Sequence, residues 1–166
     1  MTQHRRFALV GILLATLVSA ETRRLTQSQL VDHAAVLDQY HRAHHEDHAF
    51  AKKALDDAQR AVSQNRWGAA FKAYGEASLV APSVDSLLGL SLSIANVARP
   101  RGKCSEALQA KLKDVSLATQ YLGVATALLQ HIDPTSLDAW NKIGNTFHAV
   151  LDVHRRLLER QDRCRS

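Results

Sequence analysis

Long stretches without proline, in which apolar residues recur every three or four positions, restrict this chain to a helical fold. The only three prolines, Pro82, Pro100 and Pro134, fall between such stretches. A recurrence of three or four gives a helix one apolar face, whereas a half-buried strand requires strict alternation, and no segment alternates. Alanine and leucine dominate the apolar residues and aromatic residues make up only 5% of the chain, which also favours helices. We therefore predict an all-α fold.

The first twenty residues differ from the rest of the chain. A basic Arg5-Arg6 pair precedes an apolar run from Phe7 to Val18, and small residues up to Ala20 end that run. This order is typical of a secretory signal peptide, so we predict cleavage after Ala20 and a periplasmic or secreted protein. The arginine pair also suggests twin-arginine export, but its flanking residues favour general secretion. As a helix the run would rise only about 18 Å, too little for a hydrocarbon core of about 30 Å, so a membrane anchor is the less favoured alternative.

The remaining chain is predicted to be one domain of modest charge. No linker rich in proline, glycine or serine divides it, and we expect an N-terminal helical segment at 21–50 followed by a helical domain at 51–166. Loss of residues 1–20 leaves 19 basic residues against 16 acidic ones, a net charge of +3. The basic residues are densest near the C-terminus, where a solvated helix face is the favoured interpretation over an anionic partner. We expect no nucleic-acid partner and no stable membrane insertion after signal cleavage.

Local signals predict where the helices begin and end. Thr26 and Gln29 have the spacing of a capping box and open a stretch to about Gln64 without glycine or proline. This stretch is one long helix or two helices that meet near its histidine-rich middle, and the pattern does not place the break. Asn65-Arg66 predicts a tight turn. Further helices are expected at 67–80, 84–98, about 106–131 with Ser105 as its cap, and 136 to about 163.

Two segments carry the residue spacing of a known helical repeat. Ala70, Tyr74, Ala77 and Pro82 are spaced by four, three and five residues, and this order resembles the second helix of a tetratricopeptide repeat. Trp67 falls at the aromatic position that opens this helix in the family. Small residues let the two helices of such a hairpin approach closely, and the aromatic residue fills the space between hairpins.

The second match follows Pro134. The run from Ala139 to Phe147 places Trp140, Ile143, Gly144 and Phe147 as in the first helix of the same repeat. The resemblance implies repeats at about 51–84, 85–134 and 137–166, the middle one degenerate and interrupted by an insertion. It implies a short solenoid of stacked antiparallel hairpins, with a long N-terminal helix and a C-terminal helix as caps. It also implies that Trp67, Tyr74, Trp140 and Phe147 are core residues. A plain helical bundle is the alternative.

The resemblance further implies a groove that binds a peptide or protein partner. In the family, partner-facing positions lie on the first helix of each repeat. A second copy of this chain, in a homo-oligomer, is an alternative partner. Carried over in phase, these positions are Lys52, Leu55, Gln59, Val62, Ser86, Gly89, Ser93, Asn96, Asp138, Asn141, Asn145 and His148. Most of these side chains are neutral and polar, so we expect recognition of an extended segment through amide hydrogen bonds.

No motif of an enzyme or of a cofactor site is present. The chain lacks a nucleophile elbow, a phosphate-binding glycine loop, a dinucleotide fingerprint and paired cysteine motifs of zinc spacing. We therefore expect a binding protein that is not an enzyme and has no cofactor. The two cysteines, Cys104 and Cys164, are expected to form a disulfide bond in an oxidising compartment, with a free or intermolecular Cys164 as the alternative.

A histidine cluster supports the competing function. His41 with His45, and His44 with His48, are each four residues apart, so on one helix either pair could bind a metal ion. The alternative hypothesis is thus a periplasmic metal-binding or metal-delivery protein. A solvated polar helix face is the favoured interpretation of these four residues, and we predict no dedicated metal site.

Overall fold

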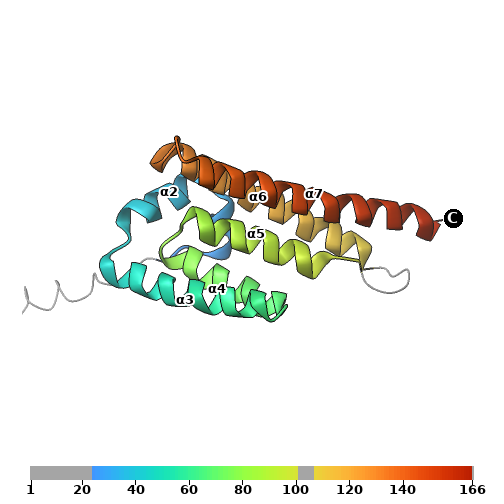
Figure 1. Ribbon diagram of the computed structural model, residues 1–166, viewed down its shortest axis with the longest axis horizontal. Coiled ribbons are helices and arrows are strands. Elements are labelled where there is room, and N and C mark those ends of the chain that lie inside the picture. The colour runs from blue at the N-terminus through green and yellow to red at the C-terminus, as the bar shows by residue number, and fades with distance from the viewer. Residues whose placement is uncertain (1–23, 101–106, 166) are drawn as a thin grey trace, which may run out of the picture.

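The computed structural model describes residues 24–100 and 107–165, and the predicted signal peptide lies outside this part of the chain. Within it, every regular element is helical, as predicted (Figure 1). A 3₁₀ turn, η1, is followed by six α-helices. The elements are η1 (Gln27–Val31), α2 (His33–Arg42), α3 (His45–Ser63), α4 (Trp67–Val80), α5 (Val84–Ala98), α6 (Leu108–Ile132) and α7 (Leu137–Arg165).

The N-terminal stretch breaks twice, where the sequence pattern could not place a break. The predicted Thr26–Gln29 capping box is present, with the Thr26 amide donating to the Gln29 side chain at 2.8 Å, but it opens only η1. Asp32 then caps α2 by accepting from two backbone amides. The chain becomes extended at Ala43 and His44, and α3 begins with a new capping box in which Asp47 accepts from the His44 amide at 2.9 Å.

The later boundaries follow the predicted turn and proline signals. Asn65 adopts a left-handed conformation with φ of 55°, and the Arg66 amide closes the turn on the Ala61 carbonyl at 2.8 Å. The helices at 67–80 and 84–98 occur as predicted. The predicted Ser105 cap lies outside the described residues. The indole nitrogen of Trp140 donates to the Pro134 carbonyl at 2.9 Å and fixes the turn between α6 and α7.

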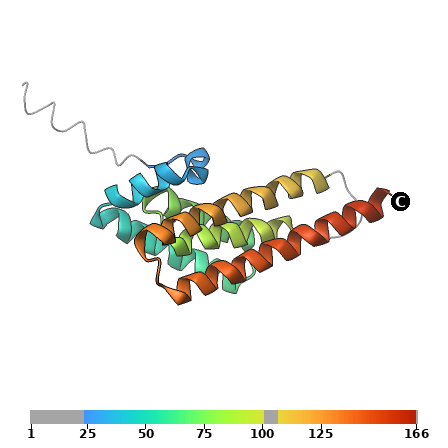
Figure 2. The ribbon, with the colours of Figure 1, turned by 90° about the horizontal axis from the view of Figure 1, so that it is seen from above.

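α5 lies at the centre of the packing. It contacts α4, α6 and α7, and eleven of its fifteen residues are buried, while Asp85 and Val97 near its two ends stay exposed. α5, α6 and α7 run side by side along the molecule (Figures 1 and 2). An ion pair of 3.5 Å joins Asp85 in the first turn of α5 to Lys142 near the start of α7, so these two helices are parallel.

α3 and α2 are attached at the margins of this group. α3 packs on α4 largely through small side chains: Ala51 and Ala54 form a buried cluster with Ala77 and with Ala81, which follows α4. Small side chains at a helix contact let the two helix axes approach closely. α2 and η1 cover α6, and the buried Gln39 side chain ties α2 to the end of α4 by donating to the Val80 carbonyl at 2.7 Å.

Candidate protein-interaction face

α7 carries two apolar stripes, and only one of them is buried. Ile143, Val150, Val153 and Leu157 are at most 8% exposed and form the contact with α5 and α6. Phe147 does not share this burial: its side chain is 42% exposed. The expectation that Phe147 is a core residue is therefore wrong, because no helix of the described chain covers that side of α7.

The second stripe consists of Gly144, Phe147, Leu151, His154 and Leu158, spaced by three, four, three and four residues; we call it the open stripe. This spacing keeps all five residues on one side of the helix. Leu151 and Leu158 are 43% and 42% exposed. A Cβ atom added at Gly144 would meet nothing within 4 Å, so the backbone itself is accessible there. The open stripe thus has the spacing of a coiled-coil seam, and no described helix packs on it.

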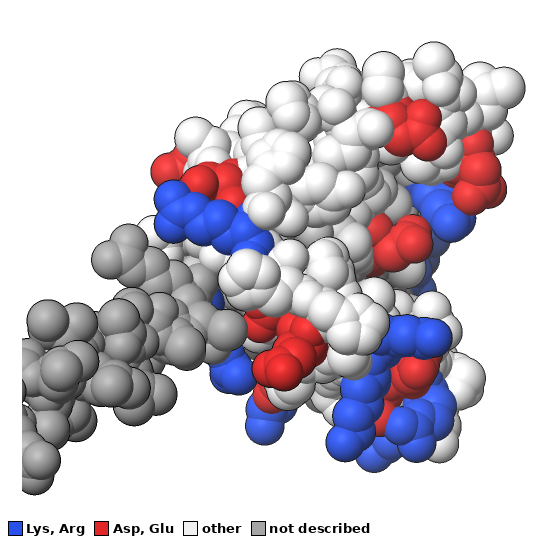
Figure 3. All heavy atoms as spheres, turned by 90° about the vertical axis from the view of Figure 1, so that its left-hand side faces the viewer, with Lys and Arg blue, Asp and Glu red and all other residues white. Residues whose placement is uncertain are grey.

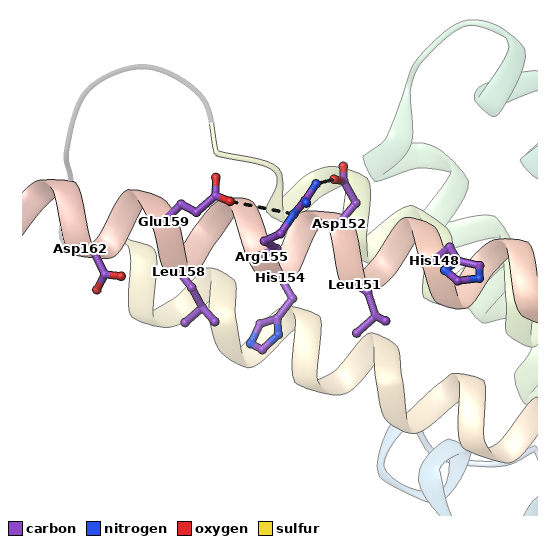
Figure 4. A pocket seen from close by; sticks show the side chains of 8 residues that line it. All are labelled: His148, Leu151, Asp152, His154, Arg155, Leu158, Glu159 and Asp162. Carbon is purple, nitrogen blue, oxygen red and sulfur yellow. Dashed lines mark hydrogen bonds and ion pairs between the residues drawn. The ribbon is translucent and has the colours of Figure 1, made fainter.

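An open groove of about 540 Å³ follows the C-terminal half of this stripe. Leu151, His154 and Leu158 point to the same side of α7 (Figure 4). The charged side chains of Asp152, Arg155 and Glu159 form the other edge of the groove. Charged groups therefore border an apolar centre. That arrangement is the usual one for a protein–protein contact.

The charged edge is held in place by ion pairs within α7. Asp152 accepts from Arg155 and from Arg156 at 2.8 Å each, and Arg155 also lies 3.9 Å from Glu159. The hydrogen bond from Arg155 is the main reason that the pKa of Asp152 is lowered. Because these pairs are solvent-exposed and local, they order the side chains more than they stabilise the fold.

The predicted groove positions on α7 lie in and beside this region. Asn141, Asn145 and His148 are exposed, and His148 lines the groove. Asp138 is exposed but is paired with Lys142 at 3.0 Å. This contact, together with that from Asp85, raises the pKa of Lys142. These positions remain candidates for a partner contact.

The predicted groove positions on α5 are not exposed. Ser86 and Ser93 are fully buried, and Ser86 donates to the Ser83 carbonyl at 2.9 Å. Asn96 is 4% exposed and donates to the Leu92 carbonyl at 2.8 Å. Because α4, α6 and α7 pack on α5, these side chains are buried in the described fold and are not accessible to a partner.

Gly89 lies beneath the ring of Tyr74, so closely that an added Cβ would overlap ring atoms. The groove positions on α3 are divided between solvent and packing, with Lys52 and Gln59 exposed and Leu55 and Val62 half-buried. Burial of α5 separates the exposed positions of α3 from those of α7, which lie on opposite sides of the molecule in Figure 1. The twelve predicted positions therefore do not form one groove.

The histidine cluster is divided by the break after α2. His41 lies in the last turn of α2, and His44 is the N-cap of α3. His45 and His48 are exposed in the first turn of α3, so His41 and His45 do not share a helix. His41 instead meets His131 of α6, with 3.4 Å between their Nε2 atoms. No local sequence pattern predicts this contact, because the two residues are 90 positions apart.

Three further observations concern the remaining sequence predictions. Cys164 is half-buried against the main core, whereas Cys104 lies outside the described residues, so their pairing stays a prediction. Acidic and basic side chains are interspersed on the face shown in Figure 3. Among the described residues, no group of three or more His, Cys, Asp or Glu side chains is placed to hold a metal ion.

Comparison with known proteins gives no relative from which a function could be transferred. The chain matches no model of a protein family, no curated protein and no solved structure. None of the described helices is both long and apolar enough to cross a membrane.

Proposed function

We propose that this protein is an interaction scaffold whose open stripe on α7 docks an amphipathic helix of a partner protein. The observation that carries the proposal is the exposure of Phe147, Leu151 and Leu158 along one side of a helix, next to an accessible Gly144. Apolar side chains that are exposed together and bordered by charged ones mark interaction sites. A helical partner fits best, because apolar residues at the same spacing would interlock with the stripe.

The resemblance to tetratricopeptide hairpins supports the same partner chemistry. In our proposal α3–α4 and α5–α6 are two hairpins of a short solenoid, and α7 is the first helix of a third. α7 continues as one helix to Arg165. A second helix of that hairpin is absent from the described residues, and the partner helix would take its place. Gly144 then has a function, since a residue without a side chain permits close approach of another backbone.

The exposed area predicts modest affinity. Full burial of a Leu or Phe side chain contributes roughly 1.5–3 kcal/mol, and somewhat less than half of that remains available at each of the three residues. The stripe therefore contributes about 1 kcal/mol per residue. Association also costs several kcal/mol of lost rigid-body freedom. Burial of the partner's own apolar residues must supply the rest, so we expect a reversible complex.

A photo-crosslinking experiment tests the proposal. A benzophenone amino acid in place of His154, which is exposed at the centre of the stripe, is irradiated in cells that produce the protein. We expect an adduct whose crosslinked segment is an amphipathic helix of another protein. That segment, made as a synthetic peptide, is then titrated against the purified protein. Adducts formed only with a second copy of this chain would contradict the proposal and indicate self-association.

Two variants and a matched control make the titration specific. Gly144→Gln adds a side chain where there is open space, so the fold is expected to tolerate it while the partner helix is blocked. Leu151→Glu places a charge in the apolar seam. We expect each to weaken peptide binding at least tenfold. Val97→Glu is the control, since Val97 is an apolar residue that is 48% exposed but lies on α5 and not on the stripe. Equal binding by all three variants would refute the assignment.

A further inference from the structure

His41 and His131 bring two imidazole rings together at the ends of two helices. Both residues lie in the last turn of their helices, α2 and α6, and their Nε2 atoms are 3.4 Å apart. The ring centroids are 5.5 Å apart and the ring planes are inclined by 78°, so the rings meet at their edges and do not stack. Both side chains are exposed.

The distance between the two nitrogen atoms fits a shared metal ion. Zinc binds histidine nitrogen at about 2.0–2.1 Å in a tetrahedral arrangement, which places two ligand nitrogens about 3.3–3.4 Å apart. The C-terminal ends of helices also carry partial negative charge, which favours a cation beside both residues. Imidazole nitrogen is a preferred ligand of Zn²⁺ and Cu²⁺. The arrangement therefore needs little movement to accept such an ion.

We propose that His41 and His131 form a two-histidine site for Zn²⁺ or Cu²⁺ that holds α2 against α6. Water would complete the coordination shell, since no third His, Cys, Asp or Glu side chain of the described chain joins the pair in a site for an ion. Affinity is then lower than that of a structural site with four protein ligands. This site does not depend on the docking face of α7.

The position of the site gives metal binding a structural consequence. α2 has only ten residues and rests on α6 beside a cavity of about 310 Å³ that His33, Leu37, Leu128 and His131 help to line. α2 contacts α6 less extensively than α5 or α7 does, so a further bond between α2 and α6 would add to the attachment of this helix. A bridging ion adds bonds between residues that are 90 positions apart, and binding to the folded state alone raises its stability. The ion would thus fasten the N-terminal helix to the rest of the protein.

Metal titration with matched histidine variants tests the proposal. The purified protein, freed of metal with a chelator, is titrated with ZnCl₂ or CuCl₂ by calorimetry, and its thermal unfolding is followed by circular dichroism. We expect one site per chain and a rise in Tm of about 5–10 °C at a hundredfold excess over Kd. The spectrum of bound Cu²⁺ in electron paramagnetic resonance should show two equivalent nitrogen ligands.

The variants identify the ligands. His41→Ala and His131→Ala should each remove the site, while their metal-free circular dichroism stays that of the parent because both side chains are exposed. A His45→Ala, His48→Ala double variant is the control, since it removes two exposed histidines of the same segment that do not meet His131. Loss of the site in this control, or its retention in His131→Ala, would overturn the proposal. Absence of any metal-dependent rise in Tm in the parent protein would also overturn it.

Discussion

Two glycines in helix interiors, Gly89 in α5 and Gly144 in α7, predict opposite effects of the same substitution. Replacement of either by alanine gains up to about 1 kcal/mol of helix propensity. At Gly144 the new methyl group meets nothing within 4 Å, so we expect the full gain. At Gly89 the methyl group overlaps the ring of Tyr74, so the ring must move. Overpacking of this kind costs about 1–3 kcal/mol.

The expected difference between the two variants follows from these two contributions. Gly144→Ala should stabilise the protein by roughly 0.5–1 kcal/mol. Gly89→Ala should leave stability unchanged or lower it by up to about 2 kcal/mol, and the smaller loss applies if the half-buried Tyr74 ring can turn toward solvent. The two variants should therefore differ by about 1–3 kcal/mol. Urea unfolding followed by circular dichroism measures this difference as a shift in midpoint at constant m-value.

A third variant shows whether Tyr74 causes the difference. Tyr74→Leu removes the ring, so Gly89→Ala in that background should lose most of its penalty, and a double-mutant cycle gives the coupling between the two positions. Equal stabilisation by Gly89→Ala and Gly144→Ala in the parent protein would refute the contact between α4 and α5 described here. A penalty at Gly89 that persists without the ring would refute its assignment to Tyr74.

Three other predictions concern different parts of the chain. The Tyr121 hydroxyl is buried, and no described residue makes a hydrogen bond of good geometry to it, although the Gln27 side chain lies beside it. Tyr121→Phe should therefore keep the free energy of unfolding or raise it by up to about 1 kcal/mol, and a fall in that free energy in urea unfolding would contradict this prediction. A Cys104–Cys164 bond closes a loop of about 60 residues and would stabilise the fold by about 4 kcal/mol. Quantitative thiol labelling of the unreduced protein should therefore detect no free thiol, and two labelled thiols in the monomer would contradict the bond. Replacement of Asn141 and Asn145 by Ala should weaken binding of the crosslinked peptide by about 1–3 kcal/mol at unchanged circular dichroism, and unaltered affinity would exclude both amides from the interface.

The sequence predicts those features of the fold that depend on neighbouring residues. The left-handed turn at Asn65 and the ends of α4 and α5 occur as expected, because turn geometry and proline act locally. The break at Ala43 and His44 was not placed, since neither residue is a glycine or a proline. The sequence feature that marks this break is the spacing of His44 and Asp47, which form a capping box.

The candidate site was predicted only in part, because periodicity identifies a helix face but not the element that covers it. Ser86, Ser93 and Asn96 share a polar face of α5, yet neighbouring helices bury that face. Phe147 belongs to an apolar face, yet no described helix covers it. The sequence signal for the open stripe was the breadth of the apolar pattern in α7. One neighbouring layer cannot bury two stripes on different sides of a helix.

The predicted disulfide bond bears on the docking face through the last turns of α7. α6 and α7 are neighbours that run in opposite directions, so α6 begins beside the end of α7 (Figure 2). Leu108 and Cys164 accordingly lie in the same core cluster. A bond from Cys164 to Cys104, four residues before Leu108, would fix the far end of α7 on α6 and limit fraying of its last turns. The C-terminal end of the open stripe, at Leu158, lies close to these turns. A stripe held straight before the partner arrives loses less conformational entropy on binding, so the oxidised protein would offer the better docking surface.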